Sequence, residues 1–196
     1  LAEKVILDTA APAVPSVSNA TSDGVVAGTA EANSVVTVTF PDSTTQTVIV
    51  NSAGSWTLTH TGGLSAGTAV TVSATDLAGN TGPVATKVVS PATPTQYLDN
   101  VAPSTGNFGT GTTTNDSTPG LLVTAPLTGQ TLKLYVDGVA VAATYDSTAG
   151  TLTPTTALAN GAHTLTYSVV DSSNNESAQS GGLTLTVDTV APTATA

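Results

Sequence analysis

The sequence has no cysteine, no arginine and only three lysines, against thirteen acidic residues in a chain of 196. Without cysteine it can form neither a disulfide nor a thiolate metal site. A formal net charge of −10 at pH 7 leaves no basic surface for nucleic acid and disfavours docking on anionic lipid. The same charge suits a monomer that repels its own copies, or a chain that collects cations.

Long hydrophobic runs and aromatic residues are also scarce. No apolar stretch approaches the roughly 20 residues that a membrane-spanning helix needs, so we expect no membrane insertion in this segment. No signal peptide is recognisable, and we interpret the chain as a piece of a longer protein. Hydrophobic residues make up 39% of the sequence but aromatic ones only 4%, so the cores must be built mainly from valine, leucine, isoleucine and alanine. Such small, β-branched cores favour narrow sandwiches over helical bundles.

A six-residue motif, which we call the junction motif, occurs three times, at residues 7–12, 98–103 and 187–192 (LDTAAP, LDNVAP and VDTVAP). Its aspartates, Asp8, Asp99 and Asp188, stand 91 and 89 residues apart. This spacing is close to the length of one immunoglobulin-like domain, about 100 residues. The repeat therefore predicts two domains in tandem.

Each predicted domain also contains a loop that begins with aspartate and ends with asparagine, at residues 76–80 (DLAGN) and 171–175 (DSSNN). We call these segments the Asp–Asn loops. Both follow one apolar run and precede another, but the second copy lacks the glycine of the first. A looser pair of acidic turns, at residues 22–24 and 115–119, comes before the second strand of each domain. The two domains are thus related but divergent.

Between these motifs apolar residues alternate with polar ones, as they do in residues 36–40 and 183–187, and this period of two predicts half-buried antiparallel strands. Glycine, asparagine, aspartate and proline separate the runs at short intervals. The pattern predicts an all-β fold of two tandem immunoglobulin-like antiparallel β-sandwich domains. The expected strands are residues 13–18, 25–30, 34–40, 45–50, 55–60, 68–75 and 84–90 in the first domain, and 104–109, 120–125, 131–137, 139–145, 150–155, 163–170 and 181–187 in the second.

We place the first domain at residues 1–97, including an N-terminal linker at 1–12, and the second at residues 98–188. Residues 189–196 would begin the linker to a following repeat. Because proline removes backbone freedom, Pro91 and Pro94 indicate a semi-rigid linker at residues 91–98. Tyr97 lies in this linker and is expected to pack between the domains.

The junction motif, the Asp–Asn loop, and residues 27–38 and 161–187 together resemble bacterial Ig-like repeats of giant surface adhesins exported by type I secretion, the RTX and biofilm-associated families. The resemblance covers nearly the whole chain. It implies an extracellular location at the bacterial cell surface, with neighbouring Ig-like repeats of the same chain as partners. It also implies a structural extender that is rigidified by calcium and supports cell adhesion and biofilm formation. Two alternatives stay open, namely a module that binds glycan or protein, and accessory domains of a secreted enzyme.

Calcium takes six to eight oxygen ligands, and no single loop in the sequence supplies them. Because the strands of a sandwich run alternately up and down, the linker aspartate that opens a domain should lie near that domain's own Asp–Asn loop. It should also approach the first turn of the preceding domain. The competing interpretation is that these residues serve turn geometry alone. The expected ligands are Asp99, Asn100, Asp171 and Asp23 at the central junction, Asp8, Asp76 and Glu31 at the N-terminal end, and Asp116 and Asp188 at the C-terminal end.

The other chemistry-bearing residues do not indicate an enzyme. His60 and His163 are the only histidines, one per domain, and no nucleophile elbow or oxyanion hole accompanies either. We therefore expect both at strand ends on the surface and no catalytic activity. Trp56, on an alternating strand, is expected in the core rather than on a sugar-binding face, and Tyr135 is expected to face outward.

Overall fold

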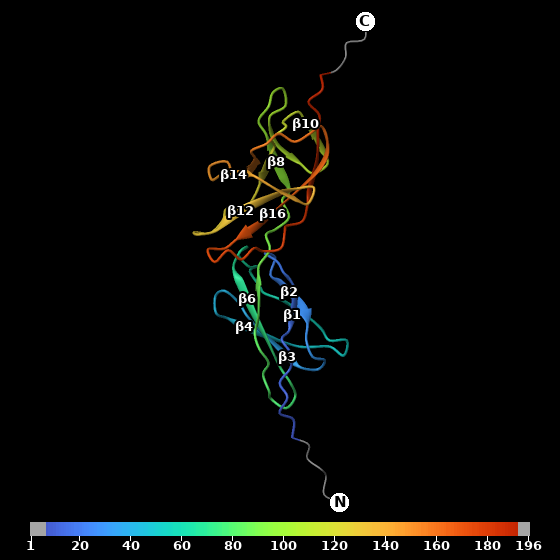
Figure 1. Ribbon diagram of the computed structural model, residues 1–196, viewed down its shortest axis with the longest axis vertical. Coiled ribbons are helices and arrows are strands. Elements are labelled where there is room, and N and C mark those ends of the chain that lie inside the picture. The colour runs from blue at the N-terminus through green and yellow to red at the C-terminus, as the bar shows by residue number, and fades with distance from the viewer. Residues whose placement is uncertain (1–6, 192–196) are drawn as a thin grey trace, which may run out of the picture. The chain divides into compact units, whose positions relative to one another are not determined.

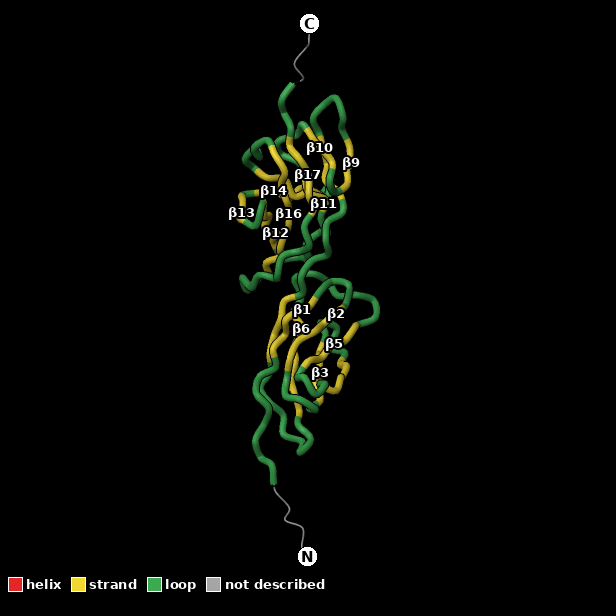
Figure 2. Tube along the Cα trace, turned by 90° about the vertical axis from the view of Figure 1, so that its right-hand side faces the viewer, coloured by secondary structure: helices red, strands yellow, loops and turns green. Residues whose placement is uncertain are grey.

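The computed structural model describes residues 7–191, which form strands and connecting loops (Figure 1, Figure 2). This range holds no helix, and so none that is long and apolar enough to cross a membrane. The chain divides into two compact units between Val89 and Ser90. Each unit consists of two sheets around its own hydrophobic core, which confirms the prediction of tandem β-sandwiches.

The strands of unit 1 are β1 (Ser16–Ala20), β2 (Val25–Thr29), β3 (Val35–Thr39), β4 (Thr45–Ile49), β5 (Ser55–Thr59), β6 (Ala69–Thr75) and β7 (Ala85–Val88). One sheet has the order β1-β2-β5 and the other the order β4-β3-β6-β7, and every pair is antiparallel. Each strand overlaps one that the sequence predicts. The period-two alternation is complete in β3 and β6, whereas a register shift between Val17 and Asn19 interrupts it in β1.

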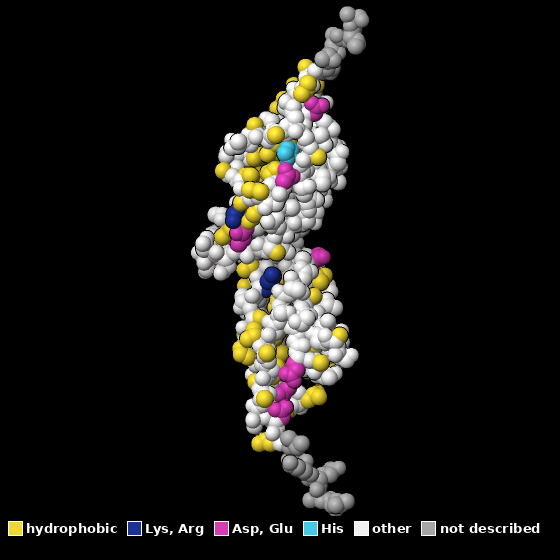
Figure 3. Space-filling model, turned by 45° about the vertical axis from the view of Figure 1, so that its right-hand side comes forward, with side chains coloured by type: hydrophobic (Ala, Val, Ile, Leu, Met, Phe, Trp, Pro, Cys, Tyr) yellow, Lys and Arg dark blue, Asp and Glu magenta, His cyan; other side chains and the backbone are white. Residues whose placement is uncertain are grey.

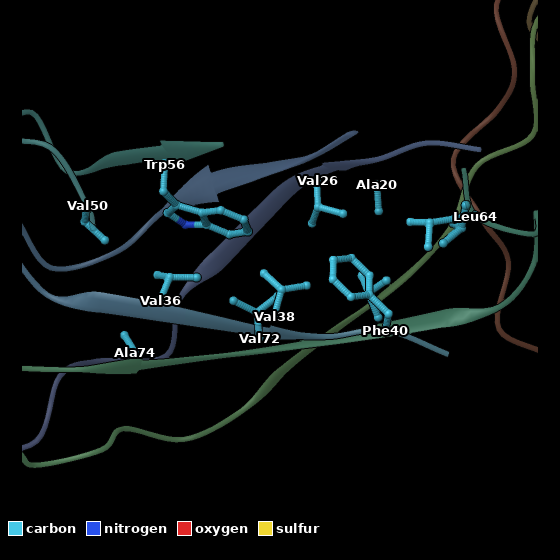
Figure 4. Close-up of a cluster of buried hydrophobic side chains, with 12 residues drawn as sticks. Ala20, Val26, Val36, Val38, Phe40, Val50, Trp56, Leu64, Val72 and Ala74 are labelled. Atoms are coloured by element: carbon cyan, nitrogen blue, oxygen red, sulfur yellow. The ribbon is translucent and has the colours of Figure 1, made fainter. Parts of the chain in front are cut away.

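The core of unit 1 shows how this alternation closes the sandwich. Across β3 and β6, Val36 pairs with Ala74 and Val38 pairs with Val72, and all four side chains are fully buried. Successive side chains of a strand point to opposite faces, so these residues form one continuous apolar surface. The second sheet covers that surface with side chains of its own (Figure 4).

Trp56 of β5 lies in this core, as predicted, with its indole between the two layers across from Val36 (Figure 4). The ring requires a small neighbour on the adjacent strand. A Cβ added to Gly28 of β2 would lie 1.9 Å from the carbonyl oxygen of Ser16 and 2.9 Å from the Trp56 ring. Glycine at position 28 thus permits both the close approach of β1 and the placement of the indole.

The strands of unit 2 are β8 (Gln96–Asp99), β9 (Gly106–Gly109), β10 (Thr112–Thr114), β11 (Gly120–Leu122), β12 (Thr131–Val136), β13 (Val139–Val141), β14 (Ala143–Asp146), β15 (Thr151–Pro154), β16 (Gly161–Val170) and β17 (Leu183–Val187). One sheet has the order β14-β15-β11-β8-β9 and the other the order β10-β17-β16-β12-β13. All pairs are antiparallel except β10 with β17. The chain changes sheet five times along unit 2, after β9, β10, β11, β13 and β15.

The core of unit 2 is built from larger side chains than that of unit 1. Tyr97, Leu121 and Leu152 come from one sheet, Leu134 and Tyr167 come from the other, and all are almost completely buried. Burial of side chains of this size contributes about 1.5–3 kcal/mol each. The two units therefore have separate cores.

The boundary between the units lies at residues 89 and 90, not at the predicted 97 and 98. The reason is Tyr97, which is fully buried in unit 2 and does not pack between domains. Its ring lies 6.0 Å from that of Phe108, and its hydroxyl is 2.9 Å from the Thr112 hydroxyl oxygen. Residues 96–99 are thus the first strand of the second sandwich, although the preceding prolines give them the appearance of a linker.

Candidate functional site

The junction motif builds the same turn in all three of its copies. One carboxylate oxygen of the aspartate accepts a hydrogen bond from the backbone N–H two residues later, at 3.0 Å for Asp8, 2.9 Å for Asp99 and 3.0 Å for Asp188. Side chains that bond the backbone in this way stabilise a turn without any ligand. The motif therefore has a local structural role wherever it occurs.

Four of the predicted ligands gather around Thr114 at one end of unit 2. Asp99 is buried at the end of β8, and its second oxygen accepts a hydrogen bond from the Thr114 hydroxyl at 2.6 Å. Asp116 is also buried, and it accepts a bond from the Asn100 N–H at 3.3 Å. The N–H of Asp188 donates to the Thr114 carbonyl oxygen at 2.8 Å. Asp99 and Asp188 both line a cleft of about 480 Å³ at this end.

The structure does not bring Asp171 to this cluster, so the predicted constellation of Asp99 with Asp171 is wrong. Gly161, at the start of β16, pairs with Val187, which precedes Asp188. Asp171 follows the last residue of the same ten-residue strand and therefore lies at the opposite end of unit 2. Asp99 is the last residue of β8 and not the residue before the first strand, so this strand carries it to the far end of unit 2.

Both Asp–Asn loops have the same internal structure. In each loop the aspartate accepts two bonds from the asparagine, one from the backbone N–H at 2.8 Å and one from the side-chain amide at 2.9 Å. These bonds, the side-chain amide first, lower the pKa of Asp76 and of Asp171. The loop needs a left-handed residue before the asparagine, with φ 91° at Gly79 and 66° at Asn174. Asparagine tolerates this conformation better than most residues, so the loop survives the loss of glycine.

The predicted N-terminal set lies at one end of unit 1, where acidic side chains are prominent in Figure 3. The side-chain amide of Asn80 donates to the Asp8 carbonyl oxygen at 3.1 Å as well as to Asp76. Glu31 is exposed in the turn before β3. Val35, the first residue of β3, pairs with Thr75, which directly precedes Asp76. Asn80 thus already bonds both aspartates of the set.

Asp23 lies at the other end of unit 1, in the turn between β1 and β2. Its carboxylate accepts bonds from the Thr21 hydroxyl and from the Val25 N–H, the latter at 3.4 Å. The hydroxyl bond, followed by the backbone bond, lowers the pKa of Asp23. Across residues 7–191, no three histidine, aspartate or glutamate side chains converge closely enough to hold a metal ion. The predicted ligand sets are therefore incomplete within either unit.

Comparison with known families identifies both units. Residues 11–92 match the bacterial Ig domain, and residues 91–189 match the bacterial Ig-like domain. The chain belongs to the bacterial Ig-like domains. No curated protein matches it.

Among solved structures, this bacterial Ig-like chain is similar to the BSP domain of a biofilm associated protein, at 20% identity and a TM-score of 0.33. The match covers 90% of the chain and 30% of that structure. A two-domain fibronectin type-III segment of chicken tenascin gives 14% identity and a TM-score of 0.39 over 90% of this chain and 99% of the other.

One side-chain network of the bacterial Ig-like chain was not predicted. Glu176, just after the second Asp–Asn loop, accepts hydrogen bonds from the Ser168 hydroxyl at 2.6 Å, the Lys133 ammonium at 3.0 Å and the Tyr135 hydroxyl. Together these donors, Ser168 first and Tyr135 second, lower the pKa of Glu176 to about 2. Tyr135 does lie outside the core cluster, but it is buried and not exposed as predicted, because the Glu176 segment covers it.

The two histidines are likewise less exposed than the sequence suggested, at 17% for the His60 side chain and 14% for His163. His163 lies between two acceptors, with Nδ1 2.7 Å from an Asp137 carboxylate oxygen and Nε2 2.9 Å from the Ala159 carbonyl oxygen. An imidazole can donate to both only when it carries two protons. The Ala159 and Asp137 bonds accordingly raise the pKa of His163. Sequence spacing gives no indication of this arrangement, since Asp137 is 26 residues away.

Proposed function

We propose that the chain is a pair of spacer repeats in a bacterial cell-surface adhesin exported by type I secretion. In this role it holds an adhesive region away from the cell and supports adhesion and biofilm formation. The observation that carries the proposal is that both units belong to bacterial Ig-like families, over residues 11–92 and 91–189. Domains of this kind are typically non-catalytic modules, and a spacer needs no substrate pocket.

The physical properties of the chain support the same role. Each unit has its own closed core, so one unit does not depend on the other for its hydrophobic stabilisation. The net charge of −10 opposes association of neighbouring copies on a crowded surface. The absence of cysteine means that folding after export would need no oxidation step.

A segment swap in the parent protein tests the proposal. If the pair acts as a spacer, replacing residues 7–191 with an unrelated Ig-like pair of equal length should preserve adhesion of the displaying cells. Deleting both units should reduce adhesion, because the adhesive region is brought closer to the cell. Surface display is equalised with an epitope tag. Loss of adhesion in the equal-length swap would show that the pair itself binds, and would overturn the spacer proposal.

Stiffening by calcium is a separate proposal, supported by the resemblance and by the concentration of carboxylates at the ends of each unit. It is tested by thermal unfolding in calcium and in chelator, on the parent chain and on Asp99→Asn and Asp99→Ala variants. Asparagine keeps the turn acceptor but removes the charge, whereas alanine removes both. A calcium-dependent rise in Tm that disappears in both variants would support a metal role. Identical melting with calcium and with chelator would refute it.

A further inference from the structure

A pocket of about 240 Å³ opens in unit 2 where two neighbouring strands separate. β8 and β11 pair only at Gly120 with Leu98 and at Leu121 with Tyr97. Beyond these pairs, residues 122–124 and 92–95 diverge and form the two walls of the pocket.

The separation has a structural cause on each side. On one wall, Val123 follows β15, because its N–H donates to the Gly150 carbonyl oxygen at 3.0 Å. On the other wall, Thr93 lies against Gly181, where an added Cβ would meet its hydroxyl oxygen at 2.1 Å. Pro94 has no N–H and cannot extend the ladder of hydrogen bonds. The pocket is therefore fixed by packing and does not depend on a mobile loop.

Tyr167 contributes the floor of the pocket. It projects from β16 of the opposite sheet and is 99% buried, with a relative exposure of 1%. Its hydroxyl has no hydrogen-bond partner among the described residues, unlike the hydroxyls of Tyr97 and Tyr135. Trp56 Nε1 is the one unpaired side-chain polar atom in residues 7–191 that is sealed from solvent, so the Tyr167 hydroxyl keeps some accessible surface, and Tyr167 lines the pocket.

The lining also indicates what kind of ligand would fit. Thr95 and Thr124 are exposed at the pocket and their hydroxyls make no hydrogen bond within the described part of the chain, whereas the Thr93 hydroxyl oxygen lies against Gly181. Pro94 and Val123 supply apolar surface, and no lining residue carries a charge at neutral pH. A ligand with several hydroxyls and an apolar face matches this chemistry, whereas an anion would find no cation and would be repelled by the net charge.

We propose that this pocket binds one sugar residue of an uncharged glycan, with a sugar hydroxyl bonded to the Tyr167 hydroxyl. At about 30 Å³ per water, the volume corresponds to roughly eight water molecules, which suits a single hexose ring and not a larger ligand. A glycan chain could continue outward, because the threonine side is exposed. The site goes beyond the spacer role, and it would add a contact to carbohydrate along the length of the adhesin.

The test uses the whole chain and a panel of neutral methyl glycosides of glucose, galactose and N-acetylglucosamine. Binding is measured by saturation-transfer NMR and by amide shifts. We expect at least one glycoside to bind weakly, with shifts confined to residues 92–95, 122–124 and 167. Tyr167→Phe should lower affinity by about tenfold, since it deletes one hydrogen bond and keeps the ring. Its Tm should stay unchanged or rise.

Tyr145→Phe is the matched control, because Tyr145 lies on β14, outside the pocket, and should leave affinity unchanged. The proposal is overturned if no neutral glycoside binds, if an acidic sugar binds more tightly than all of them, or if Tyr167→Phe keeps full affinity. Tyr167→Phe leaves the length of the chain unchanged, so failure here would not affect the spacer proposal.

Discussion

Replacing Glu176 with glutamine should destabilise unit 2 at neutral pH but not in strong acid. The carboxylate of Glu176 accepts bonds from three donors on two strands, and the pKa of this group falls from 4.5 to about 2 as a result. A carboxyl whose pKa is lowered in the folded state contributes stability at pH values above its unfolded pKa. That contribution should disappear as the pH falls from 4.5 through about 2.

The structure also sets the size of the effect. Lowering the Glu176 pKa from 4.5 to about 2 corresponds to roughly 3 kcal/mol at about 1.4 kcal/mol for each factor of ten in the acid constant, which is an upper limit. The Glu176 side chain is 32% exposed and that of Lys133 is 42% exposed, so solvent screens part of the interaction. We therefore expect Glu176→Gln to lower the free energy of unfolding of unit 2 by about 1–2 kcal/mol at pH 7.

The distribution of aromatic residues provides the assay. All four tyrosines lie in unit 2 and the single tryptophan lies in unit 1, so urea unfolding of the two units can be followed by separate fluorescence signals. The tyrosine transition of Glu176→Gln should move to lower urea at pH 7 and converge on that of the parent as the pH falls below about 2, while the tryptophan transition stays fixed. Glu31→Gln, at an exposed position, is the control and should move neither transition. An equal loss of stability at both pH values would refute the reasoning, because it would indicate lost packing and not lost charge.

Three further outcomes are expected with the same assay. Because the folded-state pKa of His163 is raised, its stabilising bonds should be fully present below pH 6.5 and lost as the pH rises through the folded pKa. This dependence of the tyrosine transition should vanish in His163→Gln. Gly28→Ala should destabilise unit 1 by more than about 2 kcal/mol in the tryptophan transition, since the new Cβ would meet a backbone carbonyl oxygen at 1.9 Å. Gly109→Ala is the control. Its new Cβ would have its nearest contact at 3.9 Å, so the stability of unit 2 should not change. Leu134→Ala should lower the stability of unit 2 alone by about 2–5 kcal/mol, and a shift of the tryptophan transition would contradict the separation of the cores.

The success of sequence prediction differed between the units because the strands differ in their side chains. In unit 1 the alternation of Val36 and Val38 with threonine marks a strand that is buried on one face, and each of the strands was predicted. In unit 2, β10 consists of three threonines and carries no apolar alternation, so it was missed. The predicted strand 139–145 is in fact β13 and β14, which join different sheets on either side of Ala142. A strand that changes sheet keeps its period of two, so sequence alone cannot locate the break.

The predicted ligands show a different limit, which concerns the roles of aspartate. All seven aspartates of the predicted sets accept a bond from a backbone N–H two or four residues later. Turn formation is therefore sufficient to explain their positions in the repeats. It does not explain the charge, because asparagine could accept the same bond, as Asn51 does from Ala53 and Ser55. Asp99 and Asp116 are buried, and burying a charged carboxylate costs more desolvation free energy than burying a neutral amide. The factor that favours aspartate over asparagine must therefore offset the largest cost at these two positions.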